Sequence, residues 1–294
     1  MTERQLIDEL TSRGPVLTDG AWGTELQQRG LEPGEMPDAW NLLHPDRVEA
    51  VARAYVEAGS RIILTNTFRA NRVAFAAHTD VERIAEINRV GVQISKRAAG
   101  DSALVFASIG PSGKLLVTGE VSEEQLAEAF SEQASAQAEG GADALVVETM
   151  GDLTEARLAV EAAKATGLPV VGCMVFDSGR QKDRTMMGVT PEQAAKELTA
   201  FGVDVVGANC GNGVAQYVPV CSRLAASTAL PIWIKPNAGI PKLVKGEVVY
   251  ETTAEAFAGF LPKLVEAGAS FIGGCCGTDP RFIGALRQQL ADTA

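Results

Sequence analysis

The feature that most constrains this chain is a strict alternation of short apolar runs with amphipathic segments, repeated eight times. The apolar runs are rich in Val and Ile and bounded by Gly or Pro, which is typical of strands buried on both faces. They occupy residues 15–18, 61–67, 103–110, 144–149, 169–176, 203–210, 231–235 and 270–275. The segments between them carry apolar residues at helical spacing. We expect helices at 45–58, 81–98, 123–139, 153–165, 191–201, 214–226, 254–267 and 280–291.

Strict alternation of strand and helix predicts parallel strands. Eight such units in 294 residues fit the size of a (β/α)8 barrel, the TIM-barrel architecture. A doubly wound open sheet is the main alternative, but no Gly-x-Gly-x-x-Gly follows the first strand and no Gly-Lys-Ser/Thr loop occurs. Because no linker rich in Pro, Gly or Ser divides the chain, we predict a single α/β domain over residues 1–294.

The charge balance excludes several classes of function. The chain carries 26 Lys and Arg against 37 Asp and Glu, a formal net charge of −11, whereas a nucleic-acid partner would require clustered basic residues. The first ten residues lack the features of a signal peptide, and the apolar runs are far shorter than the about 20 residues that a bilayer requires. Five cysteines without such a signal are typical of a reducing compartment. We therefore expect a cytoplasmic protein with no nucleic-acid or membrane partner.

Three of the five cysteines fall at the strand ends where such a barrel places its active site. Cys210 ends the sixth strand, and Cys275 and Cys276 end the eighth, so the two strand ends lie near each other around a closed barrel. Three thiolates at one point can bind Zn²⁺ and leave its fourth tetrahedral position for a substrate. These residues therefore predict a metal site.

The adjacent cysteines require a particular backbone. Neighbouring side chains on a strand point to opposite faces, so both sulfurs reach one ion only if the backbone turns there. We expect Gly273, Gly274 and Gly277 to permit that turn. A strained vicinal disulfide is the alternative, although it is rare in a reducing compartment.

The remaining cysteines and histidines have simpler interpretations. Cys173 lies within the fifth strand and Cys221 within a helix, so both are expected in the hydrophobic core. His44 and His78 lie beside helices on polar segments and are expected to be surface or capping residues.

Two acidic residues stand at the same predicted end of the barrel. Asp19 precedes Gly20 after the first strand, and it is either a turn former or a substrate ligand. Glu148 ends the fourth strand, where a buried carboxylate is costly unless a cation pairs with it. That cation is either a substrate ammonium group or a neighbouring Arg or Lys. Asp152 is expected to cap the following helix.

Six segments at these strand ends resemble the homocysteine S-methyltransferase family, and the similarity runs essentially from end to end. They are DGAWGTELQQRG (19–30), TNTFRANR (65–72), ETMGDLTEAR (148–157), GANC (207–210), KPNAG (235–239) and GGCCGT (273–278). The cysteine triad in its glycine context is highly specific. The TNTF, ETM-x-DL and PNAG segments are most similar to the homocysteine-binding module of cobalamin-dependent methionine synthase.

The resemblance implies a (β/α)8 barrel in which Cys210, Cys275 and Cys276 hold zinc and the homocysteine sulfur takes the fourth position. It also implies seven substrate-binding positions: an acid pair that grips the amino acid, backbone amides that hold its carboxylate, and three asparagines that line the site. These positions are Asp19 and Glu148, Gly20 and Gly23, and Asn66, Asn209 and Asn237.

Charge gives a physical reason for thiolate ligands. Zn²⁺ with three cysteinates carries a net charge of −1, so a substrate thiolate beside them keeps the electron density it needs to attack a methyl group. Together with this charge balance, the resemblance implies methyl transfer to L-homocysteine, which gives methionine. The expected donor is either methylcobalamin on a separate corrinoid protein or a small methylsulfonium or betaine compound.

Two alternatives remain open from the sequence. The chain is either the enzyme itself or a homocysteine-binding component that is inactive without a separate corrinoid protein. A zinc methyltransferase with a different thiol acceptor is the other alternative. The sequence does not predict an oligomeric state.

Overall fold

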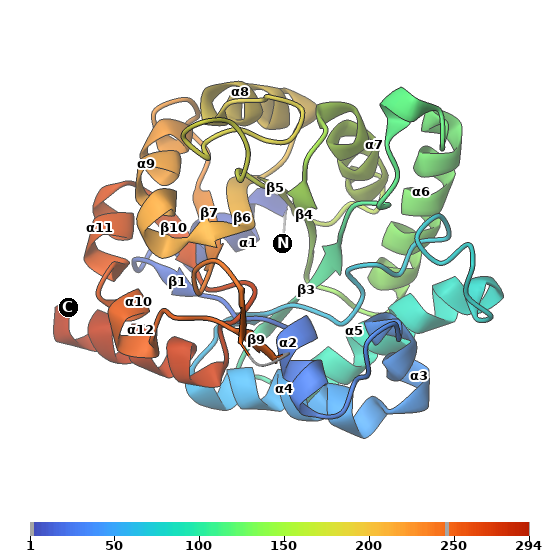
Figure 1. Ribbon diagram of the computed structural model, residues 1–294, viewed down its shortest axis with the longest axis horizontal. Coiled ribbons are helices and arrows are strands. Elements are labelled where there is room, and N and C mark those ends of the chain that lie inside the picture. The colour runs from blue at the N-terminus through green and yellow to red at the C-terminus, as the bar shows by residue number, and fades with distance from the viewer. Residues whose placement is uncertain (1–2, 245–246, 294) are drawn as a thin grey trace.

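The eight apolar runs form one parallel sheet that curves into a nearly closed barrel, which confirms the predicted (β/α)8 architecture (Figure 1). The computed structural model describes residues 3–244 and 247–293. The barrel strands are β1 (Val16–Leu17), β2 (Ile62–Ile63), β3 (Leu104–Ile109), β4 (Ala144–Met150), β5 (Val170–Met174), β6 (Val205–Gly213), β7 (Ile232–Asn237) and β10 (Ala269–Ile272).

The barrel closes between β1 and β2 through individual hydrogen bonds instead of a ladder. The Arg61 N–H donates to the Leu17 carbonyl over 2.8 Å, and the Ser60 hydroxyl donates to the Thr18 carbonyl over 3.2 Å. Just beyond β1, the carboxylate of Asp19 accepts a hydrogen bond from the Leu64 N–H at 2.7 Å. The Asp19 side chain thus extends the contact between the two strands beyond their backbone hydrogen bonds.

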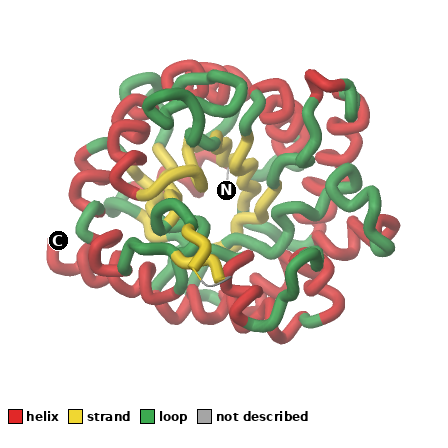
Figure 2. The backbone as a smooth tube through the Cα atoms, in the orientation of Figure 1, coloured by secondary structure: helices red, strands yellow, loops and turns green. Residues whose placement is uncertain are grey.

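Helices surround the strands as an outer layer (Figure 2). The predicted helical segments correspond to α4 (Pro45–Ala58), α5 (Ile84–Ala99) with the 3-10 turn η2 (Val81–Arg83), α6 (Glu123–Glu139), α7 (Leu153–Lys164), α8 (Pro191–Phe201), α9 (Val214–Ala225), α10 (Ala254–Ala258) with α11 (Leu261–Glu266), and α12 (Pro280–Thr293). Asp152 caps α7 as expected, since its side chain accepts from the N–H groups of Thr154 and Glu155. In the described part of the chain, no helix is long and apolar enough to cross a membrane.

The single helix expected at 254–267 is interrupted. Pro262 has no amide hydrogen, and its ring would clash with the carbonyl of Ala258 in a continuous helix. The structure accordingly ends α10 at Ala258 and begins α11 at Leu261.

Further elements lie before the first strand or in the connections, and the sequence patterns did not predict them. They are α1 (Glu3–Thr11), α2 (Gly23–Gln28), η1 (Pro37–Ala39), α3 (Trp40–Leu43), η3 (Leu116–Thr118) and the antiparallel hairpin of β8 (Lys242–Val244) and β9 (Glu247–Val249). Helix α1 packs Ile7 against the barrel interior and is visible through the ring of strands in Figure 1.

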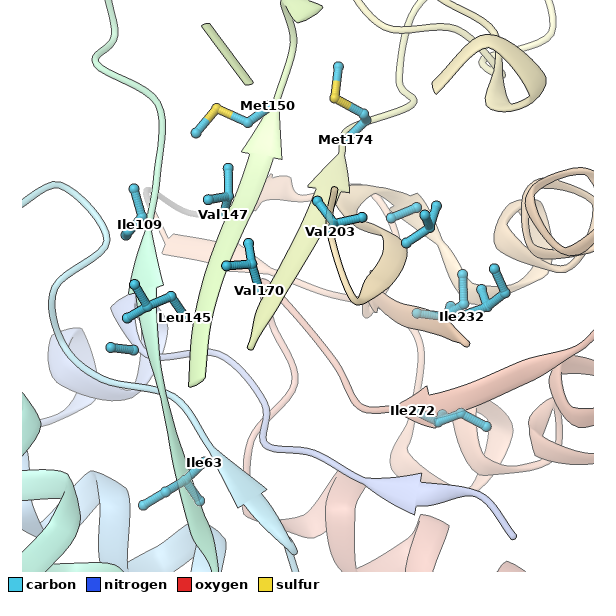
Figure 3. Close-up of a cluster of buried hydrophobic side chains, with 14 of the residues drawn as sticks. Ile63, Ile109, Leu145, Val147, Met150, Val170, Met174, Val203, Ile232 and Ile272 are labelled. Atoms are coloured by element: carbon cyan, nitrogen blue, oxygen red, sulfur yellow. The ribbon is translucent and has the colours of Figure 1, made fainter. Parts of the chain in front are cut away.

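Two buried layers follow from the two-residue repeat of the strands. Outward-facing residues such as Leu145, Val147 and Val170 pack between the sheet and the helices (Figure 3). Their neighbours Val146 and Val171 face inward and belong to a separate interior cluster.

Aromatic rings fill the barrel interior. The Trp233 ring lies 6.1 Å from the Phe106 ring and 5.4 Å from the Phe271 ring, measured between centroids. All three residues are completely buried. We call Phe106, Trp233 and Phe271 the aromatic floor, because the candidate site lies above them.

Candidate active site and metal centre

At the carboxyl-terminal end of the barrel, the inward-facing positions change from apolar to polar. On three strands, a buried interior residue is followed two positions later by a polar residue, because the same face continues to the end of the strand. These pairs are Phe106 and Ser108 on β3, Val146 and Glu148 on β4, and Trp233 and Lys235 on β7. We call Ser108, Glu148 and Lys235 the polar layer, and it lies where parallel barrels carry their chemistry.

The structure brings Cys210, Cys275 and Cys276 together at this end, as predicted. Their sulfur atoms all lie within 4.8 Å of one another, and no other group of three potential metal ligands was found among the described residues. Hydrogen bonds with Cys275 and Cys276 hold the pKa of Cys210 well below its ordinary value, and the bonds to Cys210 raise the pKa of both partners. The thiolate form is therefore favoured at Cys210 over its two neighbours. We call these three residues the cysteine cluster.

Two backbone turns orient the sulfurs. Cys210 has a φ of 64°, which is uncommon for a residue with a side chain, and Gly277 has a φ of 81°. The prediction that Gly273 and Gly274 also provide the turn is wrong, because neither has a positive φ. Both are required for another reason: a Cβ at either position would overlap a neighbouring threonine side chain.

A pocket of about 380 Å³ opens beside the cysteine cluster and includes all three cysteines in its wall. Four predicted substrate-binding residues also line it, namely Gly20, Gly23, Asn66 and Glu148. Trp22 and Phe68 give part of the wall an aromatic surface. The pocket has the size and mixed lining of a small-molecule site.

Glu148 is buried and held by two hydrogen bonds. The Ser108 hydroxyl donates to Oε1 at 2.5 Å, and the Asn209 amide donates to Oε2 at 3.0 Å. Burial raises the pKa of Glu148 above its ordinary value, although the positive charge of Lys235 and the Ser108 hydrogen bond oppose this effect. The carboxylate therefore has a fixed position in the pocket wall.

Asn209 and Asn237 lie behind the pocket lining. Asn209 accepts from the Thr149 N–H at 2.7 Å, and its own amide lies 4.0 Å from the Cys275 sulfur. Asn237 donates to the Gly211 carbonyl at 2.7 Å. Its Oδ1 is buried and has no hydrogen-bond partner in the described chain. Direct contact of these two residues with a substrate stays a prediction.

Asp19 also lies behind the lining, where it meets a residue that sequence reasoning missed. Its completely buried carboxylate accepts from the Trp22 indole and the Leu64 N–H, each at 2.7 Å, and forms an ion pair with Lys235. Contact between Asp19 and a substrate likewise stays a prediction. The two-residue alternation of PIWIK places Lys235 on the same strand face as Trp233, which was the available signal.

Asp38 is the second missed residue, and it lines the same pocket. Burial raises the pKa of Asp38 to about 6, although the Arg69 N–H donates to its Oδ1 at 2.9 Å and partly opposes that effect. Asp38 lies in η1, within a connection that has no periodic pattern, so no sequence signal indicated it.

The other cysteines and histidines are placed as expected. Cys173 and Cys221 are buried in hydrophobic clusters. Burial raises the pKa of Cys221 to about 12. His44 is exposed beside α4, and His78 is half-buried near η2.

Comparison with known proteins identifies one family and two relatives of this chain. A family model described as homocysteine S-methyltransferase matches residues 16–290. The chain is 31% identical over 314 residues to methionine synthase of Mycobacterium tuberculosis (strain ATCC 25618 / H37Rv) and 30% identical over 310 residues to that of Mycobacterium leprae (strain TN). These alignments cover 99% and 98% of this chain but 26% and 25% of the relatives. The chain therefore spans about a quarter of their length.

Solved structures agree with the barrel fold. The metallated form of the homocysteine methyltransferase MmuM from Escherichia coli matches with a TM-score of 0.81 at 24% identity, covering 97% of this chain and 99% of that one. The oxidized form of MmuM matches with a TM-score of 0.78 at 25% identity, covering 94% and 96%.

Proposed function

Because the chain belongs to the homocysteine S-methyltransferase family, we propose that it uses Zn²⁺ to transfer a methyl group to the thiol of L-homocysteine, forming methionine. The observation that carries this proposal is the cysteine cluster. Three sulfurs from two distant parts of the chain meet within 4.8 Å in the wall of a pocket. That arrangement leaves room for a fourth sulfur, supplied by the substrate.

The cysteine cluster fits Zn²⁺ in chemistry and in spacing. Tetrahedral Zn–S bonds of about 2.3 Å place sulfurs about 3.8 Å apart, and small side-chain rotations reach that spacing from separations within 4.8 Å. The Asn237 side chain hydrogen-bonds Cys210, and its buried Oδ1 has no hydrogen-bond partner among the described residues. That oxygen is a further potential metal ligand beside the cysteines. When bound, Zn²⁺ lowers the pKa of a coordinating thiol, so that the nucleophilic thiolate exists at neutral pH.

The pocket residues bind and orient the amino acid. Both oxygens of Glu148 are anchored by hydrogen bonds, so a substrate ammonium group meets a carboxylate in a fixed position. The loop from Gly20 to Gly23 offers backbone amides to the substrate carboxylate, apart from the Ala21 N–H, which donates to the Thr278 carbonyl at 2.9 Å. Trp22 and Phe68 exclude water from the reacting sulfur, which keeps the thiolate weakly solvated and reactive.

The surface at the carboxyl-terminal end of the barrel, where the pocket opens, favours a methyl donor that is carried by a protein. Seven exposed large apolar side chains lie in connections that leave the carboxyl ends of barrel strands. They are Leu43, Leu115, Val117, Met186, Met187, Ile240 and Val249. These residues come from four connections that all leave the same end of the barrel, so that end offers apolar contacts to a protein partner. We therefore favour docking of a separate methylcobalamin-carrying corrinoid protein over a small methylsulfonium or betaine donor.

The same surface supports a second candidate function. In it, the chain is a homocysteine-binding component that has no activity until the corrinoid protein docks. The two candidates share the acceptor site and differ only in whether a small donor suffices.

Methionine formation from a panel of donors tests both candidates. Zinc-loaded protein is incubated with L-homocysteine and, separately, S-methylmethionine, betaine, free methylcobalamin or a methylated corrinoid protein, with the Cys210→Ala variant as control. We expect methionine with the corrinoid protein, and none from the variant. Turnover with a small donor alone would exclude the inactive-component function.

A binding measurement addresses the acceptor. X-ray absorption at the zinc edge should show a fourth sulfur neighbour when homocysteine is added. If the spectrum does not change, homocysteine is not the acceptor, and the alternative of a different thiol is favoured.

A further inference from the structure

The ammonium group of Lys235 lies in the pocket but has no role in the proposed reaction. Its Nζ lies 5.9 Å from the centroid of the Trp233 ring, directly above the aromatic floor. The side chain is 2% exposed, yet it lines the pocket beside Cys275. A lysine side chain is almost never buried to this extent unless it is paired with an opposite charge.

Asp19 supplies the opposite charge, and its hydrogen-bonding capacity is taken up by protein groups. Oδ2 accepts from Trp22 and Leu64, and Oδ1 forms the ion pair with Lys235. Asp19 is completely buried and does not line the pocket. A substrate ammonium group could reach Asp19 only by displacing Lys235, so one of the two acids expected to grip the amino group is already neutralised by the protein.

Lys235 remains charged in this position. Burial disfavours the ammonium form, but the carboxylates of Asp19 and Glu148 favour it more strongly, so the pKa of Lys235 lies above its ordinary value. An ammonium group has three N–H donors, and among the described residues Lys235 donates one hydrogen bond, to Asp19. The pocket wall therefore presents a fixed positive charge with donors to spare.

Building on the proposed function, we propose that Lys235 determines acceptor specificity by binding the substrate carboxylate alongside the backbone amides of the loop from Gly20 to Gly23. Asp19 is the positioning residue that holds Lys235. A charge-assisted hydrogen bond in a largely dry pocket is stronger than a neutral one, and Lys235 repels a substrate ammonium group. The acceptor is thus recognised mainly as a thiol acid, whereas its amino group has only Glu148 as a partner.

Three homocysteine analogues test this inference on the unaltered protein. 4-Mercaptobutanoate lacks the amino group, 3-mercaptopropylamine lacks the carboxylate, and 1-propanethiol lacks both. Calorimetric titration of the zinc-loaded protein should find 4-mercaptobutanoate binding about 10- to 100-fold more tightly than 3-mercaptopropylamine. It should also find 3-mercaptopropylamine binding only slightly more tightly than 1-propanethiol, because Glu148 is the one acid left to pair with the amino group and Lys235 repels it.

A neutral variant links the preference to Lys235. Lys235→Met should lose the preference for 4-mercaptobutanoate while binding 1-propanethiol as before. Because a lone buried Asp19 is destabilising, the double variant Asp19→Asn/Lys235→Met serves if the single variant does not fold. Lys242→Met is the matched control, since Lys242 is exposed and pairs with Glu251 in the connection between β7 and α10.

The outcomes separate this inference from the proposed function. If homocysteine binds but the amine analogue binds as tightly as the acid analogue, Lys235 does not select the carboxylate, and only this inference is overturned. An unchanged preference in the Lys235 variants has the same meaning. If no thiol binds to the zinc-loaded protein, both the inference and the proposed function are wrong.

Discussion

The aromatic floor and the polar layer differ in chemistry although they occupy the same inner face of the barrel. The aromatic floor is completely buried and makes contacts between rings. The polar layer, two residues further along the strands, carries an acid, a hydroxyl and an amine that face the pocket. A two-residue step thus separates the part that stabilises the barrel from the part that meets a ligand. Substitutions in the aromatic floor should therefore lower mainly the free energy of unfolding, and those at the pocket should weaken mainly ligand binding.

The largest effect is expected at the cysteine cluster, which lies at the same end of the barrel as the polar layer. Cys210→Ala should bind Zn²⁺ more than about 100-fold more weakly, because loss of a partner outside the ligand shell alone costs 10- to 100-fold. Methyl transfer should disappear with the metal. Zinc content after dialysis, together with methionine formation, measures this.

Cys173→Ala is the matched control, since Cys173 lies in the interior cluster with Trp233. It should retain zinc and lose about 1 kcal/mol in the free energy of unfolding. Full zinc content in Cys210→Ala, or loss of zinc from Cys173→Ala, would contradict the division between the ligand-binding end and the barrel interior.

The next largest effect is expected in the aromatic floor. Trp233→Ala removes the ring that touches both Phe106 and Phe271, and it should lower the free energy of unfolding by about 3–5 kcal/mol. Urea denaturation measures this loss. Trp22→Ala, in the pocket wall, should cost less stability and weaken homocysteine binding more. Equal stability losses in the two variants would show that the floor has no special structural role.

Much of this division follows from patterns that are local in the sequence. The apolar runs and helical spacing predicted the barrel, and the glycine-flanked cysteines predicted the cysteine cluster. The Asp19–Lys235 pair was missed because its members are 216 positions apart and meet only when the barrel closes. Gly273 and Gly274 were identified for the wrong reason, because close packing, unlike a turn, depends on side chains from elsewhere in the chain.

Asp38 should produce a smaller effect that depends on pH. Its pKa is about 6 in the folded protein against an ordinary value of 3.8, so the fold favours the protonated acid. This stabilisation is fully present below about pH 4 and is lost as the pH rises through 6. The wild-type free energy of unfolding, relative to Asp38→Asn, should therefore fall by up to about 3 kcal/mol between pH 4 and 7. Urea denaturation at several pH values measures the difference, and parallel curves would contradict it.

The smallest effect is expected at Asn209, which connects Glu148 to the cysteine cluster. Its amide donates to Glu148 and lies 4.0 Å from the Cys275 sulfur, while its carbonyl accepts from the Thr149 N–H. Asn209→Ala should weaken both zinc and homocysteine binding about 10-fold, because it releases an acid and a metal ligand together. Asn212→Ala is the matched control, since Asn212 is also buried on β6 but donates to the carbonyls of Phe176 and Lys182 instead of to Glu148. If both variants lose only stability, Asn209 supports the strand without positioning Glu148 or the cysteine cluster.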